Sequence, residues 1–395
     1  MRSVVIVGAS LAGFSAAKSL RKHGFDGSIV VVGDEPHPPY QRPPLSKQFL
    51  AGTWDRPRID LRLPDTLGAE WMLGARAASL DANRREVVLD DGRQLPFGGL
   101  VIATGARARK PRWYAERPGV FTLRTLDDAI AIRDHVRAGA RRFAIVGAGF
   151  IGSEVTATLR ALGCDVTLLD VDPLPMLRVL GEPLARVCLR AHEAHGVRCE
   201  LGVAVEGLTG ESSVEGVRLA DGRVIDADGI VVGTGVVPNV EWLRDSGIDL
   251  REGVACDAAC AVKGADRIVA AGDVARCDHP YFGSHRVEHW NNGITQGDAA
   301  AQTLLAAPGD AAPHVAIPFF WSDQYDSKLQ VVGLPSPTDT MHVVEGSLDA
   351  PRFVALYERD GVATAAFLCN SMHRAAAYTA IVEAAAREAA HAGAP

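Results

Sequence analysis

Two glycine-rich turns open two similar stretches of this chain, and turns of this kind hold the phosphates of a dinucleotide. The stretch that begins at Arg141 has the full Gly-x-Gly-x-x-Gly spacing, with an apolar strand before it and a helix after it. The stretch that begins at Ser3 repeats this plan with a serine at the middle glycine position. A helix that starts at such a turn offers free N–H groups and a partial positive charge to a pyrophosphate. The predicted phosphate-contacting residues are Gly8, Ser10 and Gly13 in the first turn and Gly147, Gly149 and Gly152 in the second.

An acidic residue ends the strand that follows the second turn. Asp170 stands at the end of the predicted strand 166–170, where a carboxylate accepts hydrogen bonds from the hydroxyl groups of an adenosine ribose. The next residues, Val171 and Asp172, are not arginines, and a nearby arginine is what receives the 2′-phosphate of NADPH. We therefore predict NADH rather than NADPH at the second turn.

A second dinucleotide site calls for a redox partner of NADH, and FAD is the simplest choice because the two can exchange a hydride. Each half also contains an apolar strand before a Thr-Gly turn, at 99–106 and at 229–239. The chain is predicted to cross between the two units at these turns, so that one unit is inserted into the other. An aspartate after the apolar run 268–271 would place a carboxylate near the ribityl chain of FAD. The predicted cofactor contacts in these segments are Ala103, Thr104, Gly105, Gly235, Gly272 and Asp273.

The composition is that of a well-packed protein with two or three domains. Hydrophobic residues make up 47% and charged residues 23% of the 395 residues, which argues against a disordered chain. A net charge of −7 argues against nucleic-acid and membrane-surface binding, since both need clustered lysine and arginine. No leader or long apolar segment is recognisable, so we expect a cytoplasmic protein. The 7 cysteines contain no C-x-x-C pair, so Cys256 and Cys260 are interpreted as structural thiols and no metal site is predicted.

Motifs along nearly the whole chain resemble those of the FAD-dependent, NADH-dependent ferredoxin reductases that serve bacterial Rieske oxygenases and haem monooxygenases. The serine of the first turn resembles a variant that this branch itself uses. The resemblance implies an α/β fold with two Rossmann-like dinucleotide-binding domains, for FAD and NAD, one inserted in the other, and a small α+β C-terminal domain. The implied boundaries are 1–108 and 233–315 for the FAD-binding domain, 109–232 for the NADH-binding domain and 316–395 for the C-terminal domain. The motifs include VIVGASLAG at 5–13, PPYQRPPLSK at 38–47, GAGFIGSE at 147–154, VEHWNN at 287–292 and PFFWSDQYDSKLQVVG at 318–333.

The segment from Tyr40 to Leu50 separates this branch from the related disulfide reductases. Those enzymes carry two redox cysteines there, and related NADH oxidases and peroxidases carry one, whereas this chain has none. Prolines between 36 and 44 restrict the backbone and stiffen the segment. The resemblance implies that this stiff segment holds Lys47 against the isoalloxazine edge, where a cation stabilises reduced flavin. Electrons would then leave the flavin directly for an outside acceptor.

The resemblance also implies roles for residues elsewhere in the chain. Glu154 is expected to approach the nicotinamide, although the helix dipole alone also favours a glutamate near a helix N-terminus. Trp290 and Trp321 are expected beside the isoalloxazine, although a buried tryptophan is more often a core residue. Asp34, or less favourably its neighbour Glu35, is expected to meet the FAD ribose as Asp170 meets that of NADH. The other implied cofactor contacts are Ala12, Arg42, Arg124 and Ile151, and the implied catalytic residues are Lys47, Glu154 and Trp321.

The C-terminal part of the chain predicts a domain of a different kind. Residues from about 316 contain no glycine-rich turn and are typical of short strands, followed by a helix from about Arg374. Asp360-Gly361 stands between two apolar runs and predicts a tight β-hairpin. The resemblance implies that this part caps the flavin.

The predicted function is electron transfer from NADH through FAD to a 2Fe–2S ferredoxin, an acidic redoxin, that feeds an oxygenase. NADH gives up two electrons together, an iron–sulfur cluster accepts one at a time, and FAD does both. The alternatives are an NADH oxidase, for which the missing cysteine is unfavourable, and a slow-turnover NADH-sensing flavoprotein. The basic run 107–112 is interpreted as a solvated interdomain linker or as part of a docking patch for the ferredoxin. The oligomeric state is left open between a monomer and a weak homodimer.

Overall fold

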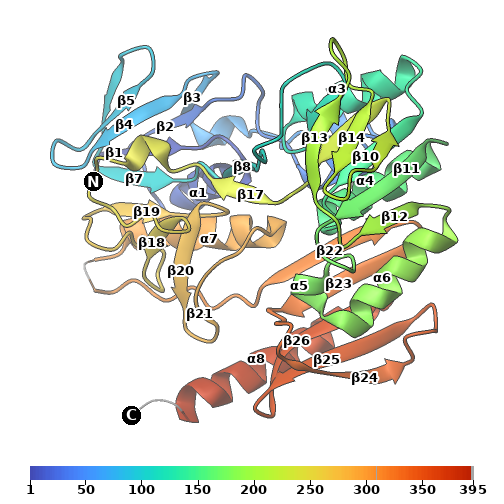
Figure 1. Ribbon diagram of the computed structural model, residues 1–395. Helices are drawn as coiled ribbons and strands as arrows, with labels where there is room; N and C mark the ends of the chain where they lie inside the picture. The colour runs from blue at the N-terminus through green and yellow to red at the C-terminus, as the bar shows by residue number, and fades with distance from the viewer. Residues whose placement is uncertain (308, 393–395) are drawn as a thin grey trace.

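The computed structural model describes residues 1–307 and 309–392, and it consists of three packed units (Figure 1). The first two units repeat one plan, in which a parallel sheet is accompanied by a small antiparallel sheet. The third unit is an antiparallel sheet with one long helix at the C-terminal end. Within the described ranges, no helix is long and apolar enough to cross a membrane.

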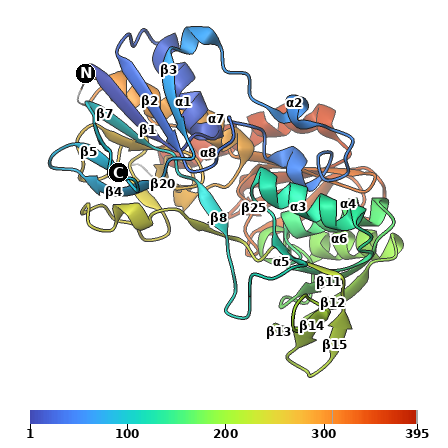
Figure 2. The ribbon, with the colours of Figure 1, turned by 90° about the horizontal axis from the view of Figure 1, so that it is seen from above.

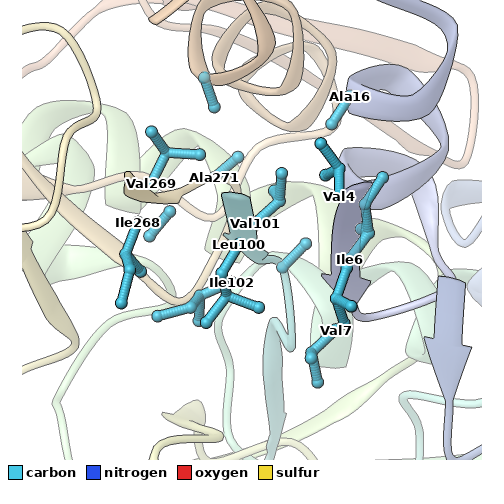
Figure 3. Packing of buried hydrophobic residues seen from close by; sticks show 14 of the residues in the cluster. Val4, Ile6, Val7, Ala16, Leu100, Val101, Ile102, Ile268, Val269 and Ala271 are labelled. Atoms are coloured by element: carbon cyan, nitrogen blue, oxygen red, sulfur yellow. The ribbon is translucent and has the colours of Figure 1, made fainter. Parts of the chain in front are cut away.

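The first unit is built on a parallel sheet with the strand order β3-β2-β1-β7-β19. Its central strands are continuous apolar runs, as expected of strands that are buried on both faces. Helices α1 and α7 pack on each other and on the sheet, while the antiparallel sheet β4-β5-β6 adds Leu80 and Val87 to the same core. Figure 3 shows this core from close by, with Val4 of β1 next to Ala16 of α1. The bounds are β1 Ser3–Val7, α1 Leu11–Lys22, β2 Ser28–Gly33, β3 Ala69–Leu73, β4 Ala77–Asp81, β5 Glu86–Leu89, β6 Gln94–Pro96, β7 Gly99–Ile102, β19 Ile268–Ala270 and α7 Trp290–Leu305.

The second unit repeats this arrangement with the strand order β12-β11-β10-β16-β9 and the small sheet β13-β14-β15. β10 lies between β11 and β16 as β1 lies between β2 and β7. In both units the strand order therefore reverses beside the strand that precedes the glycine-rich turn, which is where such sheets bind ligands. The bounds are β9 Val120–Thr122, α3 Leu126–Arg137, β10 Arg142–Val146, α4 Phe150–Ala161, β11 Asp165–Asp170, α5 Leu177–Leu180, α6 Glu182–Ala194, β12 Arg198–Leu201, β13 Val205–Thr209, β14 Gly216–Leu219, β15 Val224–Asp226 and β16 Gly229–Val232.

Two antiparallel strands connect the first unit to the second. β8 (Ala106–Ala108) leads out of the first unit, β17 (Val236–Pro238) leads back, and the two strands pair with each other. Figure 2 shows β8 between the two units, with β13, β14 and β15 projecting at the far end of the second. Asn239 fastens this crossing, because its Nδ2 donates to the Thr104 carbonyl at 2.9 Å and its own carbonyl accepts from Thr104 Oγ1 at 2.7 Å. The chain thus crosses directly after each Thr-Gly turn.

The third unit is an antiparallel sheet with the strand order β22-β23-β26-β25-β24, against which α8 packs. The predicted hairpin is confirmed, since β25 and β26 pair around Asp360 and Gly361, whose φ values of +52° and +77° are those of a type I′ turn. The bounds are β22 Phe319–Gln324, β23 Ser327–Gly333, β24 Thr340–Gly346, β25 Phe353–Arg359, β26 Val362–Cys369 and α8 Ala375–Ala392.

These three units confirm the predicted fold class: two Rossmann-like units, one inserted in the other, and a small α+β unit at the C-terminal end. The boundaries at 108, 232 and 315 stay predictions. The remaining short elements are η1 Pro43–Ser46, α2 Arg56–Ile59, η2 Asp65–Leu67, η3 Glu241–Leu243, β18 Val254–Cys256, β20 Ala275–His279, β21 Gly283–Arg286 and η4 Met372–Arg374.

Candidate functional site

The first and last glycines of the two turns are required by the backbone. Gly8 and Gly147 have φ values of +122° and +109°, in the region that favours glycine. A Cβ atom on Gly13 or on Gly152 would stand 1.9 Å from the carbonyl oxygen of Gly8 or of Gly147, respectively. These glycines therefore allow each helix to begin directly behind its turn and close to the preceding strand.

The middle position of the turns does not need glycine for the backbone. Ser10 and Gly149 are the N-caps of α1 and α4, with φ values of −100° and −77°. A Cβ atom on Gly149 would meet no protein atom within 4 Å, so the space beside it is open. Neither helix has a side-chain cap or an acidic residue in its first turn. Free N–H donors at both helix starts, and the open space beside Gly149, fit the pyrophosphates of FAD and NADH.

Asp170 lies against the second turn. Its Oδ2 accepts a hydrogen bond from Ala148 N at 2.5 Å, and its Oδ1 accepts one from Asp172 N at 2.9 Å. The carboxylate is thus held at the strand end where a dinucleotide places its adenosine ribose. This position supports the predicted contact between Asp170 and NADH.

Asp34 does not take the corresponding position in the first unit. The pairing of β1 with β2 matches that of β10 with β11, and it places Gly33 in register with Asp170. A side chain at Gly33 would clash with Ala9, because its Cβ would stand 2.4 Å from the Ala9 Cβ. Asp34 lies one residue further along and is exposed, so the expected parallel with Asp170 is wrong in register. A contact between Asp34 and the FAD ribose stays a prediction.

Glu35, the second acidic candidate, belongs to a charged network at the strand ends of the first unit. Its Oε1 accepts from Arg42 Nη2 and its Oε2 accepts from the Tyr40 hydroxyl, both at 2.5 Å. Arg42 Nη1 also donates to the Arg124 carbonyl at 2.7 Å, and Arg124 Nη2 donates to Asp273 at 2.5 Å. Burial raises the pKa of Tyr40 above its ordinary value, so the hydroxyl remains a donor. The structure thus brings four predicted cofactor residues into one network.

Lys47 and Glu154 form a buried ion pair where the three units meet. Lys47 Nζ lies 2.7 Å from Glu154 Oε2, and the two side chains are 10% and 3% exposed. The same Oε2 accepts from Ser46 Oγ at 2.5 Å, and Oε1 accepts from Ser322 Oγ at 2.8 Å. One carboxylate on α4 is therefore held by donors from the η1 segment and from β22. We call Lys47, Ser46, Glu154 and Ser322 the junction cluster.

The proline-rich segment before Lys47 is clamped onto the second unit. It ends in η1, after which Lys47 N donates to the Pro44 carbonyl at 3.0 Å. Thr158 of α4 donates from its Oγ1 to the Ser46 carbonyl at 2.8 Å. The clamp explains why Lys47 is buried and not solvated like most lysines.

Trp290 and Trp321 contact each other through ring centroids 5.8 Å apart, in an edge-to-face arrangement. Trp321 directly precedes Ser322 of the junction cluster. The Nε1 of Trp290 is buried and has no hydrogen-bond partner in the described part of the chain. An unpaired buried N–H group of this kind fits a donor to an atom of a bound cofactor. Trp290 also lines a groove of about 1060 Å³ between α1, α7 and α8, together with Lys18 and Lys22.

The remaining predicted residues lie after strand ends or in the first turns of α1 and α4. Gly105 and Gly235 occupy the Thr-Gly turns with φ values of +62° and +91°. Gly272 donates its N–H to Gln296 Oε1 at 2.9 Å. Ile151, in the first turn of α4, is 46% exposed. Ala103 and Thr104 lie with their backbone against Gly8, and Ala12, in the first turn of α1, lies against Gly272.

Sequence reasoning missed three polar residues: Ser46 and Ser322, which join the units, and Asn239, which ties together the two strands of the crossing. Two of them were visible only as small polar neighbours of Lys47 and Trp321 within the quoted motifs. Their partners lie more than a hundred residues away along the chain, so no local pattern identifies them.

Two charges of the basic run 107–112 are neutralised by neighbours. Arg107 Nη2 lies 2.7 Å from Glu241, and Lys110 Nζ lies 2.6 Å from Glu116. Arg109 donates to the Val236 carbonyl at 3.2 Å, within the paired crossing. This geometry favours the linker interpretation, and the docking patch stays a prediction.

Comparisons with known proteins agree with this site. Residues 2–297 match the family model described as pyridine nucleotide-disulphide oxidoreductase, and residues 319–394 match the model described as reductase C-terminal. Rhodocoxin reductase of Rhodococcus erythropolis is 39% identical over 357 residues, which cover 89% of this chain and 82% of that protein. The biphenyl dioxygenase system ferredoxin–NAD(+) reductase component of Paraburkholderia xenovorans is 33% identical over 389 residues, covering 96% and 93%.

A solved structure extends the similarity to three dimensions. The reductase in the covalent putidaredoxin reductase–putidaredoxin complex superposes with a TM-score of 0.90 at 32% identity, over 97% of this chain and 93% of that one. The match covers all three units, including the C-terminal one. The chain therefore belongs to the pyridine nucleotide-disulphide oxidoreductase family, among its FAD-dependent NADH:ferredoxin reductases, and this family membership implies FAD and NADH as its cofactors.

Proposed function

We propose that this flavoprotein passes electrons from NADH through FAD to a 2Fe–2S ferredoxin that feeds an oxygenase. The observation that carries the proposal is the junction cluster, in which Lys47, on a segment without cysteine, forms a buried ion pair with Glu154 of α4. The 7 cysteines are all at position 164 or beyond, so this segment offers no thiol to relay electrons. Relatives named as ferredoxin–NAD(+) reductase components of dioxygenase systems support the ferredoxin as acceptor.

The side chains of the junction cluster supply position and charge. FAD, when bound, supplies the redox chemistry that the protein lacks, because it accepts two electrons together and releases them singly. Lys47 would place a positive charge at the isoalloxazine edge, where it stabilises negative charge. Glu154 holds Lys47 in place and is itself oriented by Ser322 of the third unit.

NADH binding is assigned to the second unit. Gly147, Gly149 and Gly152 would accommodate the pyrophosphate, and Asp170 would accept the adenosine hydroxyl groups. Glu154 lies two residues after Gly152 on α4, so one helix connects the nucleotide turn to the junction cluster. This rigid connection supports a nicotinamide that is positioned close to Lys47.

Electron exit is assigned to the tryptophan pair. Trp290 contacts Trp321 and lines the groove between α1, α7 and α8, which two lysines also line. Aromatic side chains at this edge would shorten the gap to a docked cluster. Asp298 and Glu383 line the same groove as Lys18 and Lys22, so the proposal of an acidic redoxin rests on the resemblance and not on the charge of the groove.

Anaerobic mixing of the holoprotein with one equivalent of NADH, followed by an oxidised 2Fe–2S ferredoxin, tests the proposal. We expect the flavin to bleach quickly and to reoxidise as the ferredoxin is reduced. Trp321→Ala should slow the ferredoxin step more than the NADH step. Trp113→Ala controls for the loss of an indole, because Trp113 is partly buried against the core of the second unit and not part of the tryptophan pair. Slow bleaching to a long-lived state that several ferredoxins fail to discharge would instead indicate an NADH-sensing protein.

A further inference from the structure

The loop after β11 contains an arginine that sequence adjacency did not reveal. Arg178 of α5 faces Asp172 with its Nε 2.7 Å from Oδ2 and its Nη2 2.8 Å from Oδ1. Two parallel N–H bonds to the two oxygens of one carboxylate form the bidentate pairing that guanidinium groups make with carboxylates and phosphates. Asp172 therefore occupies the Nε–Nη2 edge of Arg178 and places a compensating negative charge directly on the guanidinium.

This ion pair lies beside the predicted adenosine site. Asp172 N donates to Oδ1 of Asp170, so the carboxylate assigned to the ribose and the residue that holds Arg178 are joined by a hydrogen bond of 2.9 Å. On the other side of the loop, Met176 N donates to the Ala148 carbonyl of the glycine-rich turn at 3.0 Å. Arg178 follows Met176 by two residues in the same loop and helix segment.

The pair is accessible to a ligand from solvent. The Arg178 side chain is 73% exposed, and that of Asp172 is 25% exposed. The neighbouring carboxylate raises the pKa of Arg178, so the guanidinium is charged at every physiological pH. A 2′-phosphate adds negative charge beside the adenosine ribose, and here it would meet two carboxylates and an arginine that is already paired.

We propose that Asp172 is a specificity-determining residue, which excludes 2′-phosphorylated nucleotides by holding Arg178 in the bidentate pair. NADH is favoured because the arginine is occupied, and not because an arginine is missing. Removal of the Asp172 charge frees the guanidinium for a 2′-phosphate. The inference rests on the proposed function only in that it takes the end of β11 as the adenosine site.

The test measures nucleotide binding by calorimetry on the holoprotein, without NADH oxidation or ferredoxin. The probes are 5′-AMP and adenosine 2′,5′-bisphosphate, and the measured quantity is the ratio of their two Kd values. Asp172→Asn keeps the shape of the side chain and removes its charge. Because a charge-assisted bidentate contact to phosphate replaces a repulsion, the ratio should shift towards the bisphosphate by about tenfold or more. The rate of flavin bleaching by NADPH should rise in the same variant.

Two further variants separate the arginine from a general change of charge. The double variant with Asp172→Asn and Arg178→Gln should lose the gain. Glu182→Gln breaks the exposed pair with Arg186 on α6, where the ion pair has an N···O distance of 2.6 Å, and makes the same change in net charge elsewhere in the unit. It should shift the ratio by less than about threefold, since exposed charges at a distance are screened.

The outcomes distinguish this inference from the proposed function. An unchanged ratio in Asp172→Asn, or an equal gain in the double variant, overturns the inference, provided that FAD content and circular dichroism match the wild type. Failure of the wild type to bind either probe, together with no flavin bleaching by NADH, refutes the nucleotide site itself and thereby the proposed function. Binding of 5′-AMP with the predicted shift supports both.

Discussion

Lys47→Met would leave the Glu154 carboxylate charged and buried, with two hydroxyl donors but no counter-ion. The two charges lie 2.7 Å apart, which corresponds to roughly 6 kcal/mol of attraction at an effective dielectric constant of about 20. Desolvation offsets part of this attraction, and removing one partner of a buried pair costs about 3–5 kcal/mol. We therefore expect Lys47→Met to destabilise the protein by about 3–5 kcal/mol. The double variant with Glu154→Gln should recover most of the loss, because no charge is left buried, the amide oxygen still accepts from one serine hydroxyl and the amide nitrogen can donate to the other.

Thermal unfolding of the holoprotein, followed by circular dichroism and by flavin fluorescence, measures the effect. For a cooperative domain of about 150–250 residues, each kcal/mol lost from the free energy of unfolding lowers Tm by about 2–4 °C. Lys47→Met should therefore lower Tm by roughly 6–20 °C. Lys263→Met is the matched control, since Lys263 pairs with Asp278 at 2.5 Å but the side chains are 48% and 41% exposed. It should lower Tm by no more than about 4 °C, as expected for an exposed pair.

Equal shifts in Lys47→Met and Lys263→Met would refute this reasoning. A double-mutant cycle with a coupling energy below about 0.5 kcal/mol would do the same, because residues in one ion-pair network couple by more than that. In that case the bound cofactor, and not Glu154, would be the partner that compensates Lys47.

Three other predictions follow from the geometry. Gly152→Ala should weaken NADH binding at least tenfold while FAD is retained, because the new Cβ would stand 1.9 Å from the Gly147 carbonyl oxygen. Titration of flavin bleaching with NADH measures the affinity, and an unchanged affinity would contradict the prediction. Ser10→Gly should keep the FAD-to-protein absorbance ratio of the wild type and Gly8→Ala should lower it, since only Gly8 needs a positive φ. Burial lowers the pKa of His192 to about 4. The neutral ring therefore contributes its full stability above pH 6.5, and up to about 3 kcal/mol of stability is lost as the pH falls from 6.5 towards 4. A plot of Tm against pH should be flatter over this range in His192→Gln than in the wild type.

Several features of the fold were predictable because they depend on the backbone and burial preferences of neighbouring residues. The first and last glycines of the two turns and the Asp360-Gly361 hairpin are required by positive φ angles or by close backbone contacts, which depend on residues a few positions apart. The apolar strands follow from burial on both faces of a parallel sheet. The repeat of this pattern predicted two similar units before any contact between them was known.

The contacts between units were decided only by the tertiary structure. Lys47 and Ser322 lie 107 and 168 residues from Glu154, and no local pattern ties the three together. The strand register shows that Gly33, and not Asp34, corresponds to Asp170. The sequence could not show this, because a shift of one residue changes the register but not the residue types at the end of the strand.

The arginine beside the ribose site was likewise visible in the sequence but not placed by it. Arg178 is six residues from Asp172, and the fold of that loop turns the two side chains towards each other. A sequence therefore determines which groups are available and which turns are possible. The packing of the units determines which of these groups become partners. Hydrogen bonds and ion pairs need atoms about 3 Å apart, and the number of residues between two groups in the sequence does not fix that distance.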